Sequence, residues 1–453
     1  MKKFLSLLMA LTMLMACTAC FGSAESASDP AAYDGSEVNI TFYNTMGSNL
    51  TPVLDTYIEE FNKLYPNIHV SYTSVGGYDD VRDQISKEIT VGGQPNIAYC
   101  YPDHVALYNL ARAVQPLDAY IDSTATITRA DGTTETFGLT QEQKDDFISA
   151  YYEEGRQFGD GKMYTLPMSK STEVLYYNKT FFDANGLTPP TTWDEMWELG
   201  DKAAAEGTYL FTYPTTGYFD AFFYALMYAA GGPEFFNKAT HYTEGIWDTP
   251  EAKTCFDIVA KLASYTNPIT PAQANDQDFT QNQQLVLDNK ALFMPNGTWI
   301  VGEMAEAPRA DGFEWGMTAL PAVKAGGDGY SYTWFEQAWI PAGAEHQDAA
   351  KQFVAYLYSD EACKLFAESG AIQPVLGIAD SLEGDNKMFY SIYDNGAKAA
   401  MGNFAAFSAI PGVEVRTVFF DPVNSLVSGS MTEQQWIDGI KSASDQMRAN
   451  IIE

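Results

Sequence analysis

Short strand-like segments alternate with helix-like segments from residue 38 to residue 102, and this alternation constrains the fold more than any other feature. The strand-like segments are rich in β-branched and aromatic residues, whereas the segments between them place apolar side chains on one helical face. A β-α-β-α-β order predicts a parallel sheet in a doubly wound α/β domain. The five segments are, in chain order, 38–46, 51–66, 68–75, 78–93 and 95–102.

Polar residues follow two of these predicted strands. Asn44 ends the first strand, and Asp103 and His104 come directly after the third. Ligands of parallel α/β sheets bind outside the carboxyl ends of the strands, so these three side chains are candidate ligand contacts. The structural alternatives are a turn-forming role for Asn44 and a helix N-cap role for Asp103.

The rest of the chain predicts further mixed α and β structure. A length of 453 residues suggests two or three domains. A polar, insertion-like segment at 122–160 is followed by extended runs and then by a largely helical region to about residue 305. Strand-like alternation returns at 313–344, and two amphipathic helices are expected at 346–370 and 432–453. No internal repeat is visible.

The N-terminus has the pattern of a bacterial secretory signal. Lys2 and Lys3 precede an apolar run at 4–16, which is shorter than the roughly 20 residues needed to span a membrane. The run ends in Leu-Met-Ala followed by Cys17, which resembles the lipobox, whose cysteine is diacylated and becomes the mature N-terminus. Cys20 is a second, less well-fitting candidate, and an ordinary secretory signal with incidental cysteines is the alternative.

A flexible tether is expected after the lipidated cysteine. Residues 17–37 are rich in Ser, Ala, Gly, Asp and Glu and show no hydrophobic period. Residues 1–16 would then be a lipoprotein signal peptide, and no later stretch is long and apolar enough to span a membrane. The sequence therefore predicts a protein anchored by lipid to the extracytoplasmic face of a bacterial cell membrane.

Charge and motif content exclude several classes of function. The chain has 26 Lys and Arg against 59 Asp and Glu, a net charge of −33, which disfavours nucleic acids and anionic lipid surfaces as partners. No GxSxG, HExxH, Walker or GxGxxG motif occurs, so we expect no enzyme, although 59 acids could supply a glycosidase pair.

No metal or other cofactor is expected. Cys100, Cys255 and Cys363 are far apart and without CxxC spacing, so they are expected to be buried small apolar residues. The acidic run 275–278 lacks the complete loop that would bind Ca²⁺.

Several segments together resemble one known family. The most specific is LYYNKTFFDANGLTPPTTWDE at 175–195, and the segments at 291–304, 315–323 and 340–375 support it. The chain resembles the extracellular solute-binding proteins of family 1, which are the sugar-binding subunits of ABC importers. The resemblance covers nearly all of the mature chain, and the insertion around 122–146 and the long segment 375–420 are departures particular to this sequence.

The resemblance implies a two-lobe, periplasmic-binding-protein-like α/β fold with a ligand cleft between the lobes and a hinge of crossover strands. We expect crossovers near 167–172, 319–321 and 342–345. The N-terminal lobe would comprise 38–170 plus 321–344, and the C-terminal lobe 171–320 plus 345–453. Ligand binding would shift an open–closed equilibrium, and the importer's membrane subunits would recognise the closed state of this monomer.

A sugar site needs aromatic faces for C–H groups and convergent polar groups for hydroxyls. Trp299 matches a family position that stacks on sugar, and Trp334 and Glu336 lie where the family places a cleft loop. Thr172 and Glu173 lie on the first crossover. Core packing or surface exposure is the alternative for each residue. The predicted ligand contacts are Asn44, Asp103, His104, Thr172, Glu173, Tyr218, Trp299, Trp334, Glu336, Gln373 and Arg416.

The expected ligand is a carbohydrate. Aromatic residues make up 14% of the chain, which favours an oligosaccharide over a monosaccharide. A binding lipoprotein of the same fold for a peptide, polyamine or other non-sugar solute is the alternative. A buried aromatic platform would favour sugar, whereas a buried ion-pairing set of Asp and Arg would favour a peptide or an amine. Replacing Trp299 or Trp334 by Ala is expected to weaken ligand binding without unfolding the protein.

Overall fold

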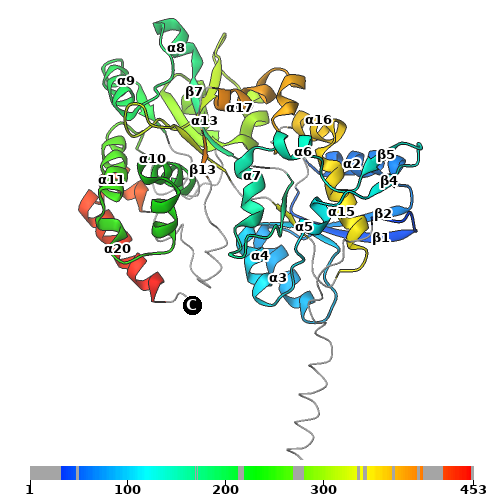
Figure 1. The fold of residues 1–453 in the computed structure, drawn as a ribbon. Coiled ribbons are helices and arrows are strands. Elements are labelled where there is room, and N and C mark those ends of the chain that lie inside the picture. The colour runs from blue at the N-terminus through cyan, green and yellow to red at the C-terminus, as the bar shows by residue number, and fades with distance from the viewer. Residues whose placement is uncertain are drawn as a thin grey trace, which may run out of the picture.

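Two separate β-sheets organise the chain, one in each of two lobes (Figure 1). The structure is a computed structural model. It describes residues 32–46, 50–168, 170, 172–212, 219–268, 280–333, 337–339, 344–369, 373–394, 398–400 and 422–449. The predicted mixed α/β fold with two lobes is confirmed.

The first sheet has the strand order β2-β1-β3-β12-β6. β1, β2 and β3 are parallel, and β12 runs antiparallel to both β3 and β6. The β-α-β-α-β order predicted from residue 38 is therefore present. The strands are β1 (Val38–Asn44), β2 (Ile68–Ser74), β3 (Ile97–Cys100), β6 (Leu166–Pro167) and β12 (Gln337–Trp339), and β4 (Thr126–Thr128) and β5 (Thr134–Thr136) form a separate hairpin.

Helices cover both faces of the first sheet. Leu54, Tyr57 and Phe61 of α2 recur at helical spacing and are buried against one face, and Val81 and Ile85 of α3 are buried against the other. The helices of this lobe are α2 (Thr51–Leu64), α3 (Tyr78–Ile89), α4 (Pro102–Leu110), α5 (Asp118–Ile121), α6 (Gln141–Asp146), α7 (Ser149–Glu153), α15 (Gln347–Ala355) and α16 (Asp360–Glu368), with 3-10 turns η1 (Glu154–Arg156), η5 (Tyr356–Tyr358) and η6 (Gly377–Ser381).

The second sheet has the order β13-β11-β7-β9-β8, and β10 also pairs with β7. β8 is parallel to β9 and β11 is parallel to β13, whereas β7 is antiparallel to its neighbours. The strands are β7 (Thr172–Asn178), β8 (Tyr209–Phe211), β9 (Ala291–Gly297), β10 (Trp315–Thr318), β11 (Tyr330–Thr333) and β13 (Lys398–Ala400).

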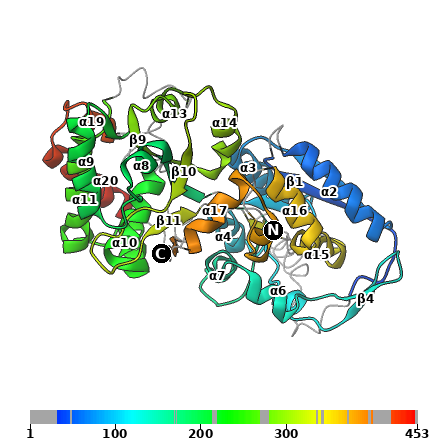
Figure 2. The ribbon, with the colours of Figure 1, turned by 90° about the horizontal axis from the view of Figure 1, so that it is seen from above.

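Helices also cover the second sheet, and several begin at a side-chain cap. The Thr192 hydroxyl accepts a hydrogen bond from the Glu195 N–H at the start of α9, and Gly232 with φ 67° breaks α10. Figure 2 shows α17 between the two lobes. The helices are α8 (Lys179–Asn185), α9 (Trp193–Ala205), α10 (Phe219–Thr240), α11 (Pro250–Ala263), α13 (Thr280–Leu287), α14 (Val301–Glu306), α17 (Asp385–Asp394), α19 (Val423–Val427) and α20 (Glu433–Arg448), with η3 (Ile246–Asp248) and η4 (Thr298–Ile300).

The chain crosses between the lobes at positions that only partly match those expected. The first crossing lies between β6 and β7, inside the expected range 167–172. The second lies between β11 and β12, after Thr333 rather than near 319–321, because β11 still pairs with β7.

The expected lobe boundaries are also wrong for α15 and α16. We expected all of 345–453 in the C-terminal lobe, but α15 and α16 pack on α2 of the first lobe, where the Phe61 and Phe353 rings meet edge to face at 5.2 Å. An amphipathic pattern predicts that a helix buries one face and does not identify the surface that it covers.

Two further predictions concern the cysteines and membrane-spanning helices. The three cysteines of the folded part, Cys100, Cys255 and Cys363, are free and buried, as predicted. Among the helices that the structure describes, none is long and apolar enough to cross a membrane.

Candidate functional site

The carboxyl edges of the two sheets face the same connection between the lobes. β6 runs parallel to β1, β2 and β3, so the chain leaves the first sheet at its carboxyl edge after Pro167. It enters the second sheet at Thr172, which pairs with Thr333 at the end of β11, and Glu173 pairs with Gly297 at the end of β9. This is the topological position at which open α/β sheets bind ligands.

An aromatic pair lies at the carboxyl edge of the first sheet. Tyr78 begins α3 and Tyr101 precedes α4, and their rings stack at a centroid distance of 3.9 Å and an angle of 19°. Both side chains are only partly buried. A stacked pair of half-exposed rings offers a flat apolar face with hydroxyl groups at its rim.

Asn44 ends β1 beside this pair of strand ends. Its Oδ1 accepts hydrogen bonds from the Met46 N–H at 3.0 Å and the Ser74 hydroxyl at 3.1 Å. Its buried Nδ2 has no hydrogen-bond partner among the residues that the structure describes. The turn-forming alternative for Asn44 is therefore present, and its amide N–H groups remain available as donors.

His104 is buried in the first turn of α4. Its Nε2 lies 3.8 Å from Asp79 Oδ1, and Arg82 Nη1 lies 2.7 Å from the same oxygen. The side chain is therefore directed toward charged neighbours on α3.

The first connection between the lobes, from β6 to β7, carries a buried ion pair and hydrogen-bonded hydroxyl groups. Lys170 Nζ lies 2.5 Å from Glu154 Oε2 and 5.5 Å from the centroid of the Tyr151 ring. The hydroxyls of Tyr151 and Thr172 lie 3.0 Å apart, and the Thr172 N–H donates to the Thr298 hydroxyl at 3.2 Å. These contacts run from α7 in the first lobe to η4 in the second.

Trp299 lies at the carboxyl end of β9, on the second lobe. Its side chain is 37% exposed, and its ring packs on Gly297, where a Cβ would come within 2.0 Å of Trp299 Cζ3. Only glycine at position 297 leaves room for the indole in this orientation. The result is a partly exposed aromatic ring at the edge that faces the first lobe.

The neighbours of Gly297 complete this edge. Asn296 Oδ1 accepts the Gly297 N–H at 2.7 Å, and its buried Nδ2 has no partner within the described part of the chain. The Tyr176 hydroxyl donates to the Gly297 carbonyl at 2.9 Å. Burial, with Glu173 and Glu303 nearby, raises the pKa of Tyr176 well above 10, so this hydroxyl stays a donor.

Gln373 lies where the chain returns toward the second lobe. The Gln373 N–H donates to the Tyr390 hydroxyl at 2.9 Å, and Tyr390 belongs to α17. The Gln373 side chain is buried. The hydrogen bond from its backbone N–H to Tyr390 joins this return segment to α17.

The predicted contacts thus divide into two groups. Asn44, His104, Thr172, Glu173, Trp299 and Gln373 lie at the strand ends or in the connections, and all except Trp299 are buried. Asp103 lies in the first turn of α4, but its side chain is outside the described residues, as are Tyr218, Trp334, Glu336, Arg416, Cys17 and Cys20. Their roles stay predictions.

Several residues of this region were not predicted from the sequence. Tyr78 and Tyr101 follow β2 and β3, so their position at strand ends was a usable signal. Asn296 was visible in the segment Asn-Gly-Thr-Trp that carries Trp299. The pairing of Lys170 with Glu154 left no sequence signal, because nothing in the pattern links residues 16 positions apart across a turn.

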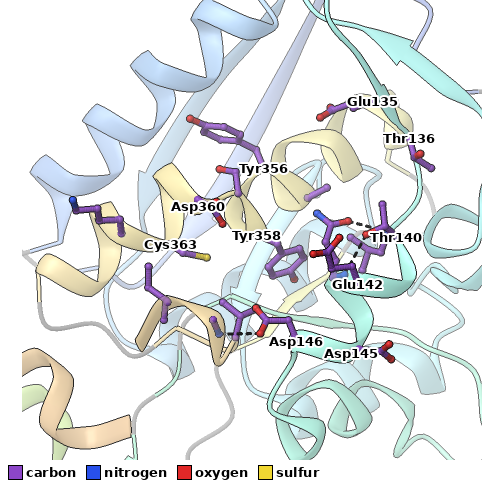
Figure 3. Close-up of a pocket in the computed structure, with 18 of the residues that line it drawn as sticks. Glu135, Thr136, Thr140, Glu142, Asp145, Asp146, Tyr356, Tyr358, Asp360 and Cys363 are labelled. Carbon is purple, nitrogen blue, oxygen red and sulfur yellow. Dashed lines mark hydrogen bonds between the residues drawn. The ribbon is translucent and has the colours of Figure 1, made fainter. Parts of the chain in front are cut away.

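A cavity lies elsewhere, within the first lobe. It has a volume of about 1240 Å³ and is lined by the β4–β5 hairpin, α6, α15, α16 and η6 (Figure 3). None of the interlobe residues named above lines it. Among the described residues, no group of three or more His, Cys, Asp or Glu side chains could hold a metal ion.

Comparisons with known proteins agree on one family and one fold. The family model for bacterial extracellular solute-binding proteins matches residues 56–387. The diacetylchitobiose-binding protein NgcE of Streptomyces coelicolor is 23% identical over 330 residues, which cover 68% of this chain and 69% of that protein. The multiple sugar-binding protein of Streptococcus mutans is 24% identical over 357 residues, 76% of this chain and 77% of that protein.

Solved structures share the architecture at low identity. The apo form of RafE from Streptococcus pneumoniae superposes with a TM-score of 0.70 and 17% identity, covering 93% of this chain and all of that one. The similarity extends over both lobes and supports the fold described above.

Proposed function

Because the chain belongs to the bacterial extracellular solute-binding proteins, as its sequence predicted, we propose that it captures a carbohydrate outside the cytoplasm and delivers it to an ABC importer. Relatives named for binding diacetylchitobiose and multiple sugars support this ligand class. The observation that carries the proposal is the pair of aromatic surfaces at facing edges, the Tyr78–Tyr101 stack on one lobe and Trp299 on the other.

The polar groups at these edges suit the hydroxyls of a sugar. Asn44 and Asn296 each have a buried amide nitrogen without a partner in the described part of the protein. An unsatisfied buried donor costs about 1–3 kcal/mol, and a sugar hydroxyl that accepts its hydrogen bond removes that cost. The aromatic faces would hold the C–H faces of the ring, and the amides would orient its hydroxyls.

Lobe closure follows from where the contacts lie. A sugar that touches Tyr101 on one lobe and Trp299 on the other binds the closed arrangement more tightly than the open one. Its differential affinity then shifts the population toward the closed state, which the importer's membrane subunits would recognise. The contacts around Lys170 and Thr172 lie on the segment that must bend during this motion.

We place this protein among binding proteins rather than enzymes, and we propose that it acts as a monomer. Binding of a peptide, a polyamine or another non-sugar solute at the interlobe site is the competing ligand class. An ion-pairing Asp and Arg set would favour it, whereas the described interlobe edges carry the Tyr78–Tyr101 stack, Trp299 and buried amides, together with the buried carboxylate of Glu173.

We also propose that Cys17 is diacylated and anchors the protein to the cell membrane after removal of residues 1–16. Metabolic labelling with radioactive palmitate tests this. The Cys17→Ser variant is expected to lose the label, and the Cys20→Ser variant is expected to keep it. The reverse pattern would assign the anchor to Cys20.

The first experiment is thermal unfolding of the soluble form, begun after Cys20, with a panel of mono- and oligosaccharides. A ligand at about 100 times its Kd adds roughly 2.7 kcal/mol of stability, which gives a visible rise in Tm. Amino acids, short peptides and polyamines serve as controls. A rise with one glycan class that is lost in Trp299→Ala supports the proposal. A rise only with a peptide, a rise with an amine that is lost in Trp299→Ala, or a sugar-dependent rise that is unchanged in Trp299→Ala overturns it.

A further inference from the structure

The cavity of about 1240 Å³ in the first lobe has walls that are fixed by hydrogen bonds. The Tyr358 hydroxyl donates to the Pro167 carbonyl at 2.7 Å, and Asp146 Oδ1 accepts the Gly377 N–H at 2.8 Å. The Leu376 N–H donates to the Asp146 carbonyl at 2.9 Å. Ligand sites in proteins are concave and largely pre-formed, and this cavity is large enough for an organic ligand.

The charges that line the cavity are predominantly negative. Its two cationic side chains have acidic partners, since Arg129 pairs with Glu135 and Lys364 Nζ lies 3.8 Å from Glu368. In contrast, Glu142, Asp360 and Asp380 have no hydrogen bond or ion pair from their carboxylates among the residues described. The cavity therefore presents uncompensated negative charge from α6, α16 and η6 (Figure 3).

A buried acceptor provides an independent sign of a ligand. Gln352 lines the cavity and is only 3% exposed. Its Nε2 donates to the Tyr65 hydroxyl at 2.9 Å and to Glu135 Oε1 at 2.6 Å, whereas its Oε1 has no partner in the described part of the chain. A buried carbonyl oxygen left unsatisfied costs about 1–3 kcal/mol, and an ammonium group would satisfy it.

The distribution of these groups distinguishes an extended organic cation from a metal ion. A divalent metal needs several carboxylates that converge on one point, and the described residues offer no such group. Here the acidic groups come from separate elements around a wide cavity, and Tyr358 projects from η5 toward Glu142 and Asp146 (Figure 3). Separate charges and an aromatic wall suit a ligand with several ammonium groups on an apolar chain.

From these observations we propose that the cavity is a second ligand site, distinct from the interlobe site, for a small organic polycation with the chemistry of a linear polyamine. The carboxylates of Glu142, Asp360 and Asp380 would pair with its ammonium groups, and Gln352 Oε1 would accept a hydrogen bond. The inference does not depend on the ligand of the interlobe site, and its test needs no sugar.

Isothermal titration of the soluble form with spermidine at 0.15 M salt tests the proposal. The cavity variant is Glu142→Gln/Asp380→Asn, and the control is Asp194→Asn/Glu198→Gln on α9 of the second lobe. Both double variants change the net charge equally and replace exposed carboxylates by amides of the same shape. A loss of about 1.4 kcal/mol, tenfold in affinity, is expected in the cavity variant, with little change in the control.

Three results would overturn the proposal. The first is the absence of saturable spermidine binding to the unchanged protein. The second is an equal loss of affinity in both double variants, which would mean non-specific attraction to a chain of net charge −33. The third is complete competition by Mg²⁺ at concentrations close to that of spermidine, which would indicate a metal site instead.

Discussion

Lys170 Nζ lies 2.5 Å from Glu154 Oε2 in the first connection between the lobes, and the two side chains are 0% and 1% exposed. Burying two charges costs several kcal/mol per ion, so their attraction must offset a large desolvation cost. The pair joins η1 of the first lobe to the segment that enters β7 of the second. It thereby fixes the point at which the chain passes from one lobe to the other.

Removing one partner of this pair is expected to destabilise the protein strongly. Lys170→Met removes the ammonium group that pairs with the buried Glu154 carboxylate, and a loss of about 3–5 kcal/mol in the free energy of unfolding is expected. Urea unfolding followed by circular dichroism measures it. The double variant Lys170→Met/Glu154→Leu removes both charges and should recover most of the loss. A single variant as stable as the unchanged protein would contradict the buried pairing.

Gly297→Ala is expected to weaken sugar binding, because the new Cβ would meet the Trp299 ring at 2.0 Å and displace it. A fall in affinity of about tenfold is expected by calorimetry, equivalent to about 1.4 kcal/mol. The matched control is Gly302→Ala on the adjacent α14, where a Cβ meets nothing within 4 Å. Equal affinities in the two variants would show that the position of the indole does not matter for the ligand.

Tyr101→Ala is expected to lower affinity for the sugar while leaving the fold intact. The substitution removes one ring of the stacked pair at the edge of the first lobe, and an aromatic contact contributes about 0.5–1.5 kcal/mol beyond its buried area. Tyr209→Ala is the control, because Tyr209 is 40% exposed on the second lobe and lies at the first residue of β8, away from the carboxyl edge. Calorimetry at constant temperature compares the two. An unchanged Kd in Tyr101→Ala would show that the Tyr78–Tyr101 stack does not contact the sugar.

Because Lys351 is buried, the free energy of unfolding is expected to increase as the pH rises above about 8. Burial lowers its pKa to about 8, with partial opposition from Glu135, and its Nζ lies 4.4 Å from the Phe137 ring. In the unfolded chain the pKa is about 10.4. Between these values the unfolded state binds more protons, so the free energy of unfolding increases with pH by up to about 3 kcal/mol.

The measurement for Lys351 compares urea unfolding at pH 7.5 and pH 9.5 in the unchanged protein and in Lys351→Met. The difference between the two proteins should shrink or change sign as the pH rises, since only the unchanged protein loses the cost of a buried charge. Lys387→Met, at an exposed position, is the control for surface charge. Parallel pH curves for all three proteins would show that Lys351 is not buried as a cation.

Local pattern was enough to predict much of the fold. The alternation of periods from residue 38 predicted β1, α2, β2, α3 and β3, because each element buries one face and therefore repeats apolar residues at its own spacing. The cap at Thr192 before α9 is equally local, since the groups that satisfy a helix end lie within four residues of it.

The candidate site was predicted less completely, because it is assembled from distant parts of the chain. Trp299 and Asn44 could be chosen from strand ends and from family resemblance. The stack of Tyr78 on Tyr101 joins the ends of two strands, and its geometry depends on how α3 and α4 leave the sheet. The sequence pattern does not show which residue each of these rings stacks on.

What the sequence by itself determined is the β-α-β-α-β order from residue 38, the α/β class and the acidic, aromatic character of the chain, which follow from local spacing and composition, and the family, which follows from the resemblance of several segments. Only the tertiary structure decided that α15 and α16 pack on the first lobe, that β12 returns to the first sheet, and that Lys170 meets Glu154. The physical reason is that burial and pairing between distant segments depend on the shapes of both surfaces. A one-dimensional pattern records that a face is apolar or charged and carries no information about which surface completes it.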